Sequence, residues 1–148
     1  MPTKRKSRKK SFKMMNIEEL PNEMLINIFK NRKFNDLVNL YYTNRRLRAI
    51  AIDIVKRDKS KNRKLRVYSK RNDIRSVRLL LDAGADPDSK GKSGNTALGM
   101  ASYYGNIGIV TMLLESGADI DIQDNYGDTP LINAVEGEEI ETVILLLE

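Results

Sequence analysis

A repeated pattern in the second half of the chain constrains the fold more than any other feature. The pair Leu80-Leu81 recurs as Leu113-Leu114 and as Leu146-Leu147, at a spacing of 33 residues each time. A period of this length is typical of a solenoid, in which each unit buries its apolar face by stacking on its neighbours. The other recurring pairs are Gly84-Ala85-Asp86 with Gly117-Ala118-Asp119, Asp88 with Asp121, Gly94 with Gly127, Thr96 with Thr129, Leu98 with Leu131, Ala101 with Ala134, and Val110 with Val143.

Each repeated unit is expected to contain two helices. Thr96 and Thr129 are suited to cap the N-terminus of a first helix, and Gly105 permits a left-handed turn between the two helices. Glu138 stands one period after Gly105. The turn there is expected either to shift onto Gly137 or to carry about 1 kcal/mol of backbone strain.

The repeats themselves, GNTALGMASYYGNIGIVTMLLESGADIDIQDN and YGDTPLINAVEGEEIETVILLLE, resemble the ankyrin repeat, and SKRNDIRSVRLLLDAGADPD resembles a degenerate first copy. The resemblance covers residues 62–148, divided into repeats 62–93, 94–126 and an incomplete 127–148. It implies an array of two to three repeats with β-hairpin fingers, which binds proteins and has no catalytic residues. Because so few repeats are marginal for stability, we expect a low melting temperature or association through the last apolar helix face.

The resemblance also implies where a protein substrate binds, namely on the fingers and on the concave helical surface. Tyrosine gives a large contact area at low entropy cost, so Tyr103, Tyr104 and Tyr126 are candidate hot spots. For Tyr104, packing between repeats is an alternative of equal weight. The substrate-binding candidates are Lys70, Arg71, Lys92, Ser93, Asn95, Tyr103, Tyr104, Asn125, Tyr126, Asp128 and Glu136.

Residues 16–56 predict a separate helical module that is rich in apolar side chains. From Leu20 to Val55, 19 of 36 residues are apolar, which is more than a module of about 40 residues can bury. The surplus predicts a partner surface. The expected helices are Pro21 to about Asn31, about Asp36 to Thr43, and about Arg45 to Lys56, with Asn35 and Asn44 as caps.

The stretch LPNEMLINIF, with Asp36-Leu37 and NRRLRAI after it, resembles the F-box. This resemblance implies docking onto the Skp-type adaptor of a cullin-RING ubiquitin ligase, while the ankyrin repeats recruit a substrate. The same pairing resembles effectors with which intracellular bacteria and large DNA viruses redirect a host ligase. The residues that the resemblance assigns to adaptor binding are Leu20, Pro21, Glu23, Met24, Leu25, Ile28, Phe29, Leu37, Leu47 and Ile50.

An alternative interpretation of the same segment stays open. In this interpretation the N-terminal helices serve solely as a terminal cap of the array, as in other solenoids, and the protein is a non-ligase scaffold or nuclear inhibitor. In the first helix we expect Met24, Leu25, Ile28 and Phe29 to face inward together, which leaves Leu20 and Ile26 pointing elsewhere.

The composition excludes several chemistries. Cysteine and histidine are both absent, which removes disulfides, Cys/His zinc sites, thioester carriers and imidazole acid–base catalysis. We therefore expect no catalytic residues, no metal, no cofactor and no small-molecule substrate, so that any role in ubiquitin transfer is that of an adaptor. No apolar run approaches the roughly 20 residues that cross a bilayer. We expect an intracellular protein of the nucleus or cytosol. If the protein is an effector, the cell is a host cell.

Charge is segregated along the chain. Residues 79–148 hold two basic and thirteen acidic residues, whereas residues 1–13 hold seven basic and no acidic residues. We expect residues 1–15 to be a disordered arm and residues 57–61 to be a basic linker, with only nonspecific binding of nucleic acid through the arm. A solubilising tail is the alternative to a nuclear localisation signal, whose candidate residues are Lys4, Arg5, Lys6, Arg8, Lys9 and Lys10.

Overall fold

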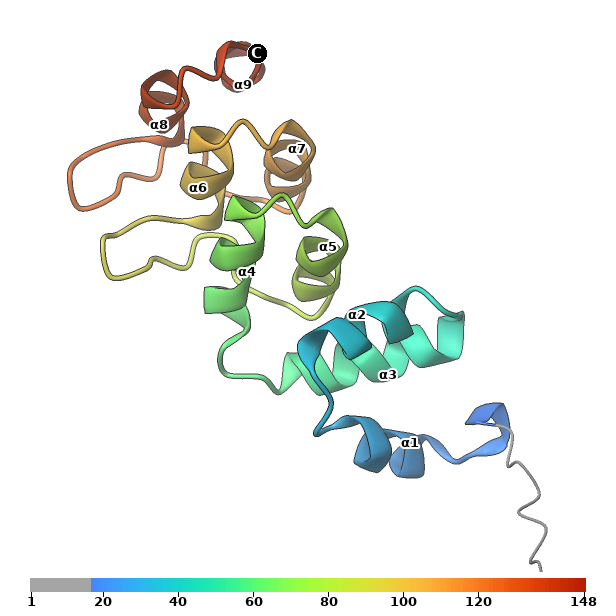
Figure 1. Ribbon diagram of the computed structural model, residues 1–148. Helices are drawn as coiled ribbons and strands as arrows, with labels where there is room; N and C mark the ends of the chain where they lie inside the picture. Colours follow the sequence, from blue (N-terminus) through green and yellow to red (C-terminus); the bar gives the residue numbers. More distant parts are fainter. Residues whose placement is uncertain (1–16) are drawn as a thin grey trace, which may run out of the picture.

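The computed structural model describes residues 17–148, apart from the side chain of Glu18, and confirms an all-helical protein for that part of the chain (Figure 1). None of the helices described there is long and apolar enough to cross a membrane. The elements are η1 (Ile17–Glu19), α1 (Asn22–Phe29), α2 (Phe34–Tyr41), α3 (Arg45–Lys56), α4 (Lys61–Lys70), α5 (Ile74–Asp82), α6 (Ala97–Tyr103), α7 (Ile107–Glu115), α8 (Pro130–Glu136) and α9 (Ile140–Leu147).

The last six helices form three stacked pairs, α4 with α5, α6 with α7, and α8 with α9 (Figure 1). The helix α6 packs between α4 and α8, and α7 packs between α5 and α9, so the array has two helical layers. Leu80 and Leu113, one period apart, are both fully buried. The side-chain amide of Asn106 donates a hydrogen bond of 2.7 Å to the carbonyl of Ser69 and ties the second pair to the first.

Threonine caps begin two of these helices, as expected. The hydroxyl of Thr96 accepts a hydrogen bond of 3.1 Å from the backbone N–H of Gly99, and Thr129 accepts one of 3.3 Å from Ile132. Each bond satisfies an N–H that has no partner within its helix. Pro130 follows as the first residue of α8, where a missing N–H costs nothing.

The turn between the helices of each pair uses a left-handed residue at one repeat position. Asn72, Gly105 and Glu138 are spaced by the repeat period and have φ angles of 57°, 63° and 60°. Glu138 therefore carries the strain, and the turn does not shift to Gly137. Gly137 instead ends α8 with a φ of −77° and lies against Tyr103, where an added Cβ would stand 2.1 Å from the carbonyl oxygen.

The predicted β-hairpin fingers are not confirmed, since no strand occurs among the described residues. The loops at the finger positions project to one side of the array (Figure 1). Each loop is closed by one backbone bond, from Gly91 N–H to the Asn95 carbonyl at 2.8 Å and from Asp124 N–H to the Asp128 carbonyl at 3.0 Å. The N–H of Asn125 donates to the carbonyl of Ser93 at 3.1 Å, so successive loops support one another.

The N-terminal helices pack around a small core of their own. Leu20, Leu25, Leu47 and Ile50 are its buried members. Leu20 precedes the cap residue Pro21, and Leu25 is the fourth residue of α1, an arrangement known as a hydrophobic staple. The staple draws Leu20 inward and fixes how the chain enters α1.

The expected orientation of the first helix is therefore wrong in part. Met24 and Ile28 are exposed, whereas Leu20 is buried and Ile26 packs partly against the core. Leu25 and Phe29 form the inward face, and Met24 and Ile28 lie about 100° around the helix from them.

The ends of the first two helices also differ from expectation. Helix α1 begins after Pro21 and ends at Phe29, and α2 begins at Phe34 after Lys33. The expected cap at Asn35 is thus wrong, because that residue lies inside the helix. The expected cap at Asn44 is confirmed, since its side chain accepts a hydrogen bond of 2.9 Å from the N–H of Leu47.

The N-terminal module and the array share one hydrophobic core. Val38 and Val55 from the module belong to the same buried cluster as Leu65 and Val77 from the array. At the edge of this cluster the ring of Phe34 stacks on that of Tyr68, with centroids 5.1 Å apart. The helices α2 and α3 therefore also cover the first face of the array.

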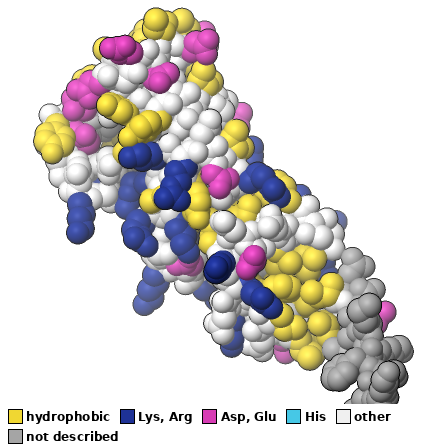
Figure 2. Space-filling model, viewed as in Figure 1, with side chains coloured by type: hydrophobic (Ala, Val, Ile, Leu, Met, Phe, Trp, Pro, Cys, Tyr) yellow, Lys and Arg dark blue, Asp and Glu magenta, His cyan; other side chains and the backbone are white. Residues whose placement is uncertain are grey.

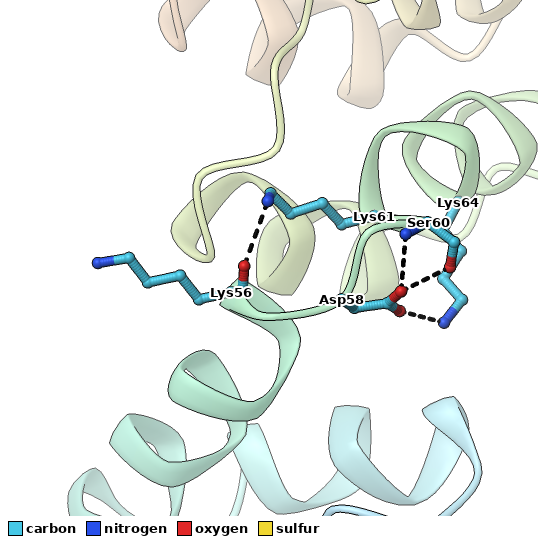
Figure 3. Close-up of polar contacts among 5 residues, drawn as sticks. All are labelled: Lys56, Asp58, Ser60, Lys61 and Lys64. Carbon is cyan, nitrogen blue, oxygen red and sulfur yellow. Dashed lines mark hydrogen bonds and ion pairs between the residues drawn. The ribbon is translucent and has the colours of Figure 1, made fainter.

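The connection between α3 and α4 is organised by Asp58, inside the segment predicted to be a linker (Figure 3). The carboxylate of Asp58 accepts hydrogen bonds from the N–H and hydroxyl of Ser60 and from the ammonium group of Lys64. Partial burial acts to raise the pKa of Asp58, but the bonds from Lys64 and Ser60 outweigh it and lower the pKa to about 2. The ammonium of Lys61 also donates to the Lys56 carbonyl at 3.2 Å across the same turn.

Candidate protein-binding surfaces

The first candidate surface is the outward side of α1. Met24 and Ile28, one helical turn apart, are 47% and 42% exposed. Pro21 and Glu23 are exposed beside them. Figure 2 shows hydrophobic side chains gathered over the N-terminal helices. We call Pro21, Met24 and Ile28 the α1 face.

The structure divides the ten residues predicted to bind an adaptor into two groups. Pro21, Glu23, Met24 and Ile28 are exposed and available to a partner. The others hold the module together, with Phe29 partly buried and packed against the cores. The buried ones are Leu20, Leu25, Leu37, Leu47 and Ile50.

The second candidate surface is a basic hollow of about 580 Å³ between α4 and the first finger loop. Arg63, Arg66 and Lys70 reach it from one side of α4, because they recur at three- and four-residue spacing. Arg71 and Lys92 complete its cationic wall. The dark-blue side chains of Lys and Arg gather on the left of Figure 2, beside this part of the array.

The guanidinium of Arg66 is the best-fixed cation in this basic hollow. Its Nη1 donates to the backbone carbonyl of Ser89 at 2.9 Å and to the Ser89 hydroxyl at 3.2 Å. Gly91 leaves room for it, because a Cβ there would lie 3.2 Å from Nε of Arg66. Burial lowers the pKa of Arg66, and the neighbouring positive charge of Arg63 lowers it further.

A smaller hollow of about 290 Å³ continues the basic one along the array. Ser93, Asn95 and Met100 line both, so the two form one groove. We call the two hollows together the concave groove. The residues that line only its second part are Tyr103, Tyr104, Asp124, Tyr126, Asp128, Asn133 and Glu136.

The three tyrosines of the concave groove differ in their surroundings. Tyr103 and Tyr104 pack edge to face with centroids 5.0 Å apart, and the Lys70 ammonium lies 4.9 Å from the centre of the Tyr104 ring. Tyr126 is 81% exposed. Tyr104 is also exposed, so burial between repeats, the alternative for this residue, is not what the structure has.

The groove gathers ten of the eleven residues predicted to bind substrate. The exception is Asn125, whose side chain donates to the Lys92 carbonyl at 3.1 Å and supports the neighbouring loop. Sequence reasoning missed Arg63, Arg66 and Asp124. The spacing of the two arginines with Lys70 on α4 was the signal that could have found them.

Other predicted features have a simpler outcome. The candidate nuclear localisation signal lies outside the described residues. Among the residues that are described, no group of three or more metal-ligating side chains comes together.

Comparison with known families agrees with this architecture. The family model for ankyrin repeats, in three copies, matches residues 65–148. The chain therefore belongs to the ankyrin-repeat family. A second family model, described as F-box-like, matches residues 17–57, so the chain is an F-box-like domain followed by three ankyrin repeats. No curated protein matches the chain.

Proposed function

We propose that the protein is a substrate-recruiting adaptor of a Skp-cullin-F-box ubiquitin ligase. Its F-box-like domain would dock onto the Skp-type adaptor, and its ankyrin repeats would hold a protein substrate. The observation that carries the proposal is the exposure of Met24 and Ile28 one turn apart on α1, within a domain whose other large apolar residues, apart from Ile17 and Tyr42, are buried or partly buried. A surplus of exposed apolar area at one place marks a partner surface.

In this role the chain would supply binding and geometry, while the chemistry stays with other proteins. The lack of cysteine and histidine is consistent with this division, because the chain offers no thiol to carry ubiquitin. The shared core that includes Val55 and Leu65 joins the F-box-like domain to the array that carries the concave groove. A bound substrate would thus be held near ubiquitin on a neighbouring subunit, and proximity would accelerate transfer.

The proposal is tested by assembling the ligase from purified parts. The protein is mixed with a Skp-type adaptor and the N-terminal domain of a cullin, and the mixture is separated by size-exclusion chromatography. A ternary complex that depends on this protein supports the function. Elution of this protein alone, with the adaptor and cullin bound to each other, contradicts it.

A second function has a specific observation in its favour. The helices α2 and α3 cover the first face of the array and share its core, as a terminal cap would. In that case the protein is an ankyrin scaffold or inhibitor without a ligase, and Met24 and Ile28 have no adaptor to bind. Chromatography distinguishes the two functions, because only the first produces the ternary complex.

The place of action remains a proposal in either case. Import into the nucleus would depend on the basic residues 4–10. A fusion to a fluorescent protein, with Lys9 and Lys10 changed to alanine in a second copy, tests this directly. Loss of nuclear signal in the second copy supports import through the arm, and an unchanged distribution contradicts it.

A further inference from the structure

We infer that the concave groove binds an extended polypeptide segment with acidic residues at one end and a basic residue at the other. The acidic residues would lie against α4, and the basic residue would lie among the tyrosines near α8. The inference rests on the proposed function only in taking the concave groove as the place where the substrate binds.

The cations that line the basic hollow are not paired with acidic side chains in the part of the chain that the structure describes. Arg63, Arg66, Lys70, Arg71 and Lys92 line the basic hollow, and none of them forms an ion pair with another described residue. Like charges held together raise the energy of the free protein, and a ligand carboxylate removes that cost. Carboxylates also match the planar fork of arginine, which favours an acidic segment at this end.

The opposite end of the groove is lined by acidic instead of basic side chains. Asp124, Asp128 and Glu136 line it together with Tyr103 and Tyr126. Carboxylates attract a cation, and an exposed aromatic face adds a cation–π contribution. A lysine or arginine of the ligand is therefore favoured here, and a further acidic residue is not.

The continuity of the groove joins these two preferences into one ligand. Ser93, Asn95 and Met100 line both parts, so a single extended chain can lie across them. Asn95 has its amide 3.1 Å from the sulfur of Met100, which leaves a polar and polarisable middle section between the charged ends. The middle section thus sets no charge requirement of its own.

Nucleic acid fits the groove less well than such a peptide. A duplex carries about one negative charge per 1.7 Å of its axis, so its phosphates would continue past the cationic hollow. Asp124 and Asp128 at the far end would repel them. A polypeptide can change its charge within a few residues, and the charges that line the groove change sign between its two parts.

The test is a titration of isotope-labelled protein, followed by NMR, with short peptides of defined charge. One peptide has a run of glutamates followed by lysines, a second has the reverse order, and a third has glutamates alone. Millimolar peptide suffices to detect weak binding. We expect one of the first two peptides to bind about tenfold more tightly than the third, with shifts at residues 63–71, 91–95 and 124–128.

Matched variants decide where the peptide binds. Arg71→Glu with Lys92→Glu should weaken binding of the glutamate-containing peptides at least tenfold. Lys59→Glu with Arg78→Glu changes the net charge equally at exposed positions outside the groove and should have little effect. Tyr126→Ala should weaken binding of the peptide that carries lysine but should not weaken binding of the peptide with glutamates alone.

Several results would overturn the inference. These are the absence of shifts at millimolar peptide, an equal loss of binding in both charge variants, no effect of Tyr126→Ala on the lysine-containing peptide, and tighter binding of a single-stranded DNA of the same length. Binding to the Skp-type adaptor is measured on the same variants. In the wild-type protein, adaptor binding without peptide binding defeats this inference alone, whereas peptide binding without adaptor binding defeats the proposed ligase role alone.

Discussion

The phenol of Tyr41 in α2 donates a hydrogen bond to the carboxylate of Asp82 at the end of α5. Burial and this bond raise the pKa of Tyr41 to about 12, since both disfavour the phenolate beside an aspartate. The bond joins the F-box-like domain to the first ankyrin repeat. It lies next to the shared core, so the two domains are expected to unfold together.

Replacing Tyr41 by phenylalanine should lower the free energy of unfolding by about 1 kcal/mol. The change removes the bond to Asp82, whose exposed carboxylate then returns to water. Urea denaturation followed by circular dichroism measures the effect. Tyr42→Phe is the control, because the hydroxyl of Tyr42 makes only a 3.5 Å contact with the Arg75 carbonyl. Equal losses in the two variants would contradict the structural role of Tyr41.

Replacing Glu138 by glycine should stabilise the protein by about 1 kcal/mol. Glu138 holds a φ of 60°, which glycine adopts without strain. The same substitution at Glu141, inside α9, should destabilise by about 1 kcal/mol because glycine is unfavourable in a helix. Thermal denaturation of both variants shows whether each substitution raises or lowers stability. A lower melting temperature for Glu138→Gly would refute the backbone strain at Glu138.

Replacing Asp58 by asparagine should cost about 1 kcal/mol of stability at neutral pH, by removing a charged acceptor of bonds from Ser60 and Lys64. The pKa of Asp58 is lowered from 3.8 to about 2. The stabilisation is therefore present above pH 3.8 and is lost as the pH falls toward 2. The difference in unfolding free energy between wild type and variant should shrink over that range.

Glu115→Gln is the control for Asp58, because Glu115 is exposed at the end of α7. Its effect should be small and should not follow the same pH dependence. A pH-independent cost for Asp58→Asn would show that the carboxylate charge contributes nothing to the turn.

The repeat array could be predicted from sequence because its signals are local. Thr96 and Thr129 cap the helices they precede, and the period places Glu138 at the left-handed position of Gly105. The caps follow from residues a few positions apart, and the left-handed position follows from the 33-residue period. The substrate-binding candidates came from the resemblance to the ankyrin repeat, and the structure gathers all but Asn125 of them along one groove.

The relation between the two domains could not be predicted, because it depends on contacts between distant residues. The sequence predicts only a basic linker at residues 57–61 between the domains, yet Leu65 just after it is fully buried and Lys64 lies 4.9 Å from the centre of the Phe34 ring. The inward turn of Leu20 was missed for a different reason. Leu20 precedes the helix, so the helical period does not describe its direction. It packs with Leu25 as a hydrophobic staple.

The proposed ligase role requires the α1 face to bind a Skp-type adaptor. Met24→Ser with Ile28→Ser removes two exposed apolar side chains of α1 and should leave the fold intact, because neither is buried. The control is Ile140→Ser with Ile144→Ser, an exposed pair with the same spacing on α9. Each double variant removes two exposed apolar side chains one helical turn apart, and the two pairs lie at opposite ends of the molecule (Figure 1).

Isothermal titration calorimetry of the three proteins against a purified Skp-type adaptor is the most direct measurement. We expect micromolar or tighter binding for the wild type and the α9 variant. The α1 variant should bind at least tenfold more weakly, with its helicity unchanged. No heat of binding for the wild type, or equal affinity of all three proteins, would contradict the ligase adaptor.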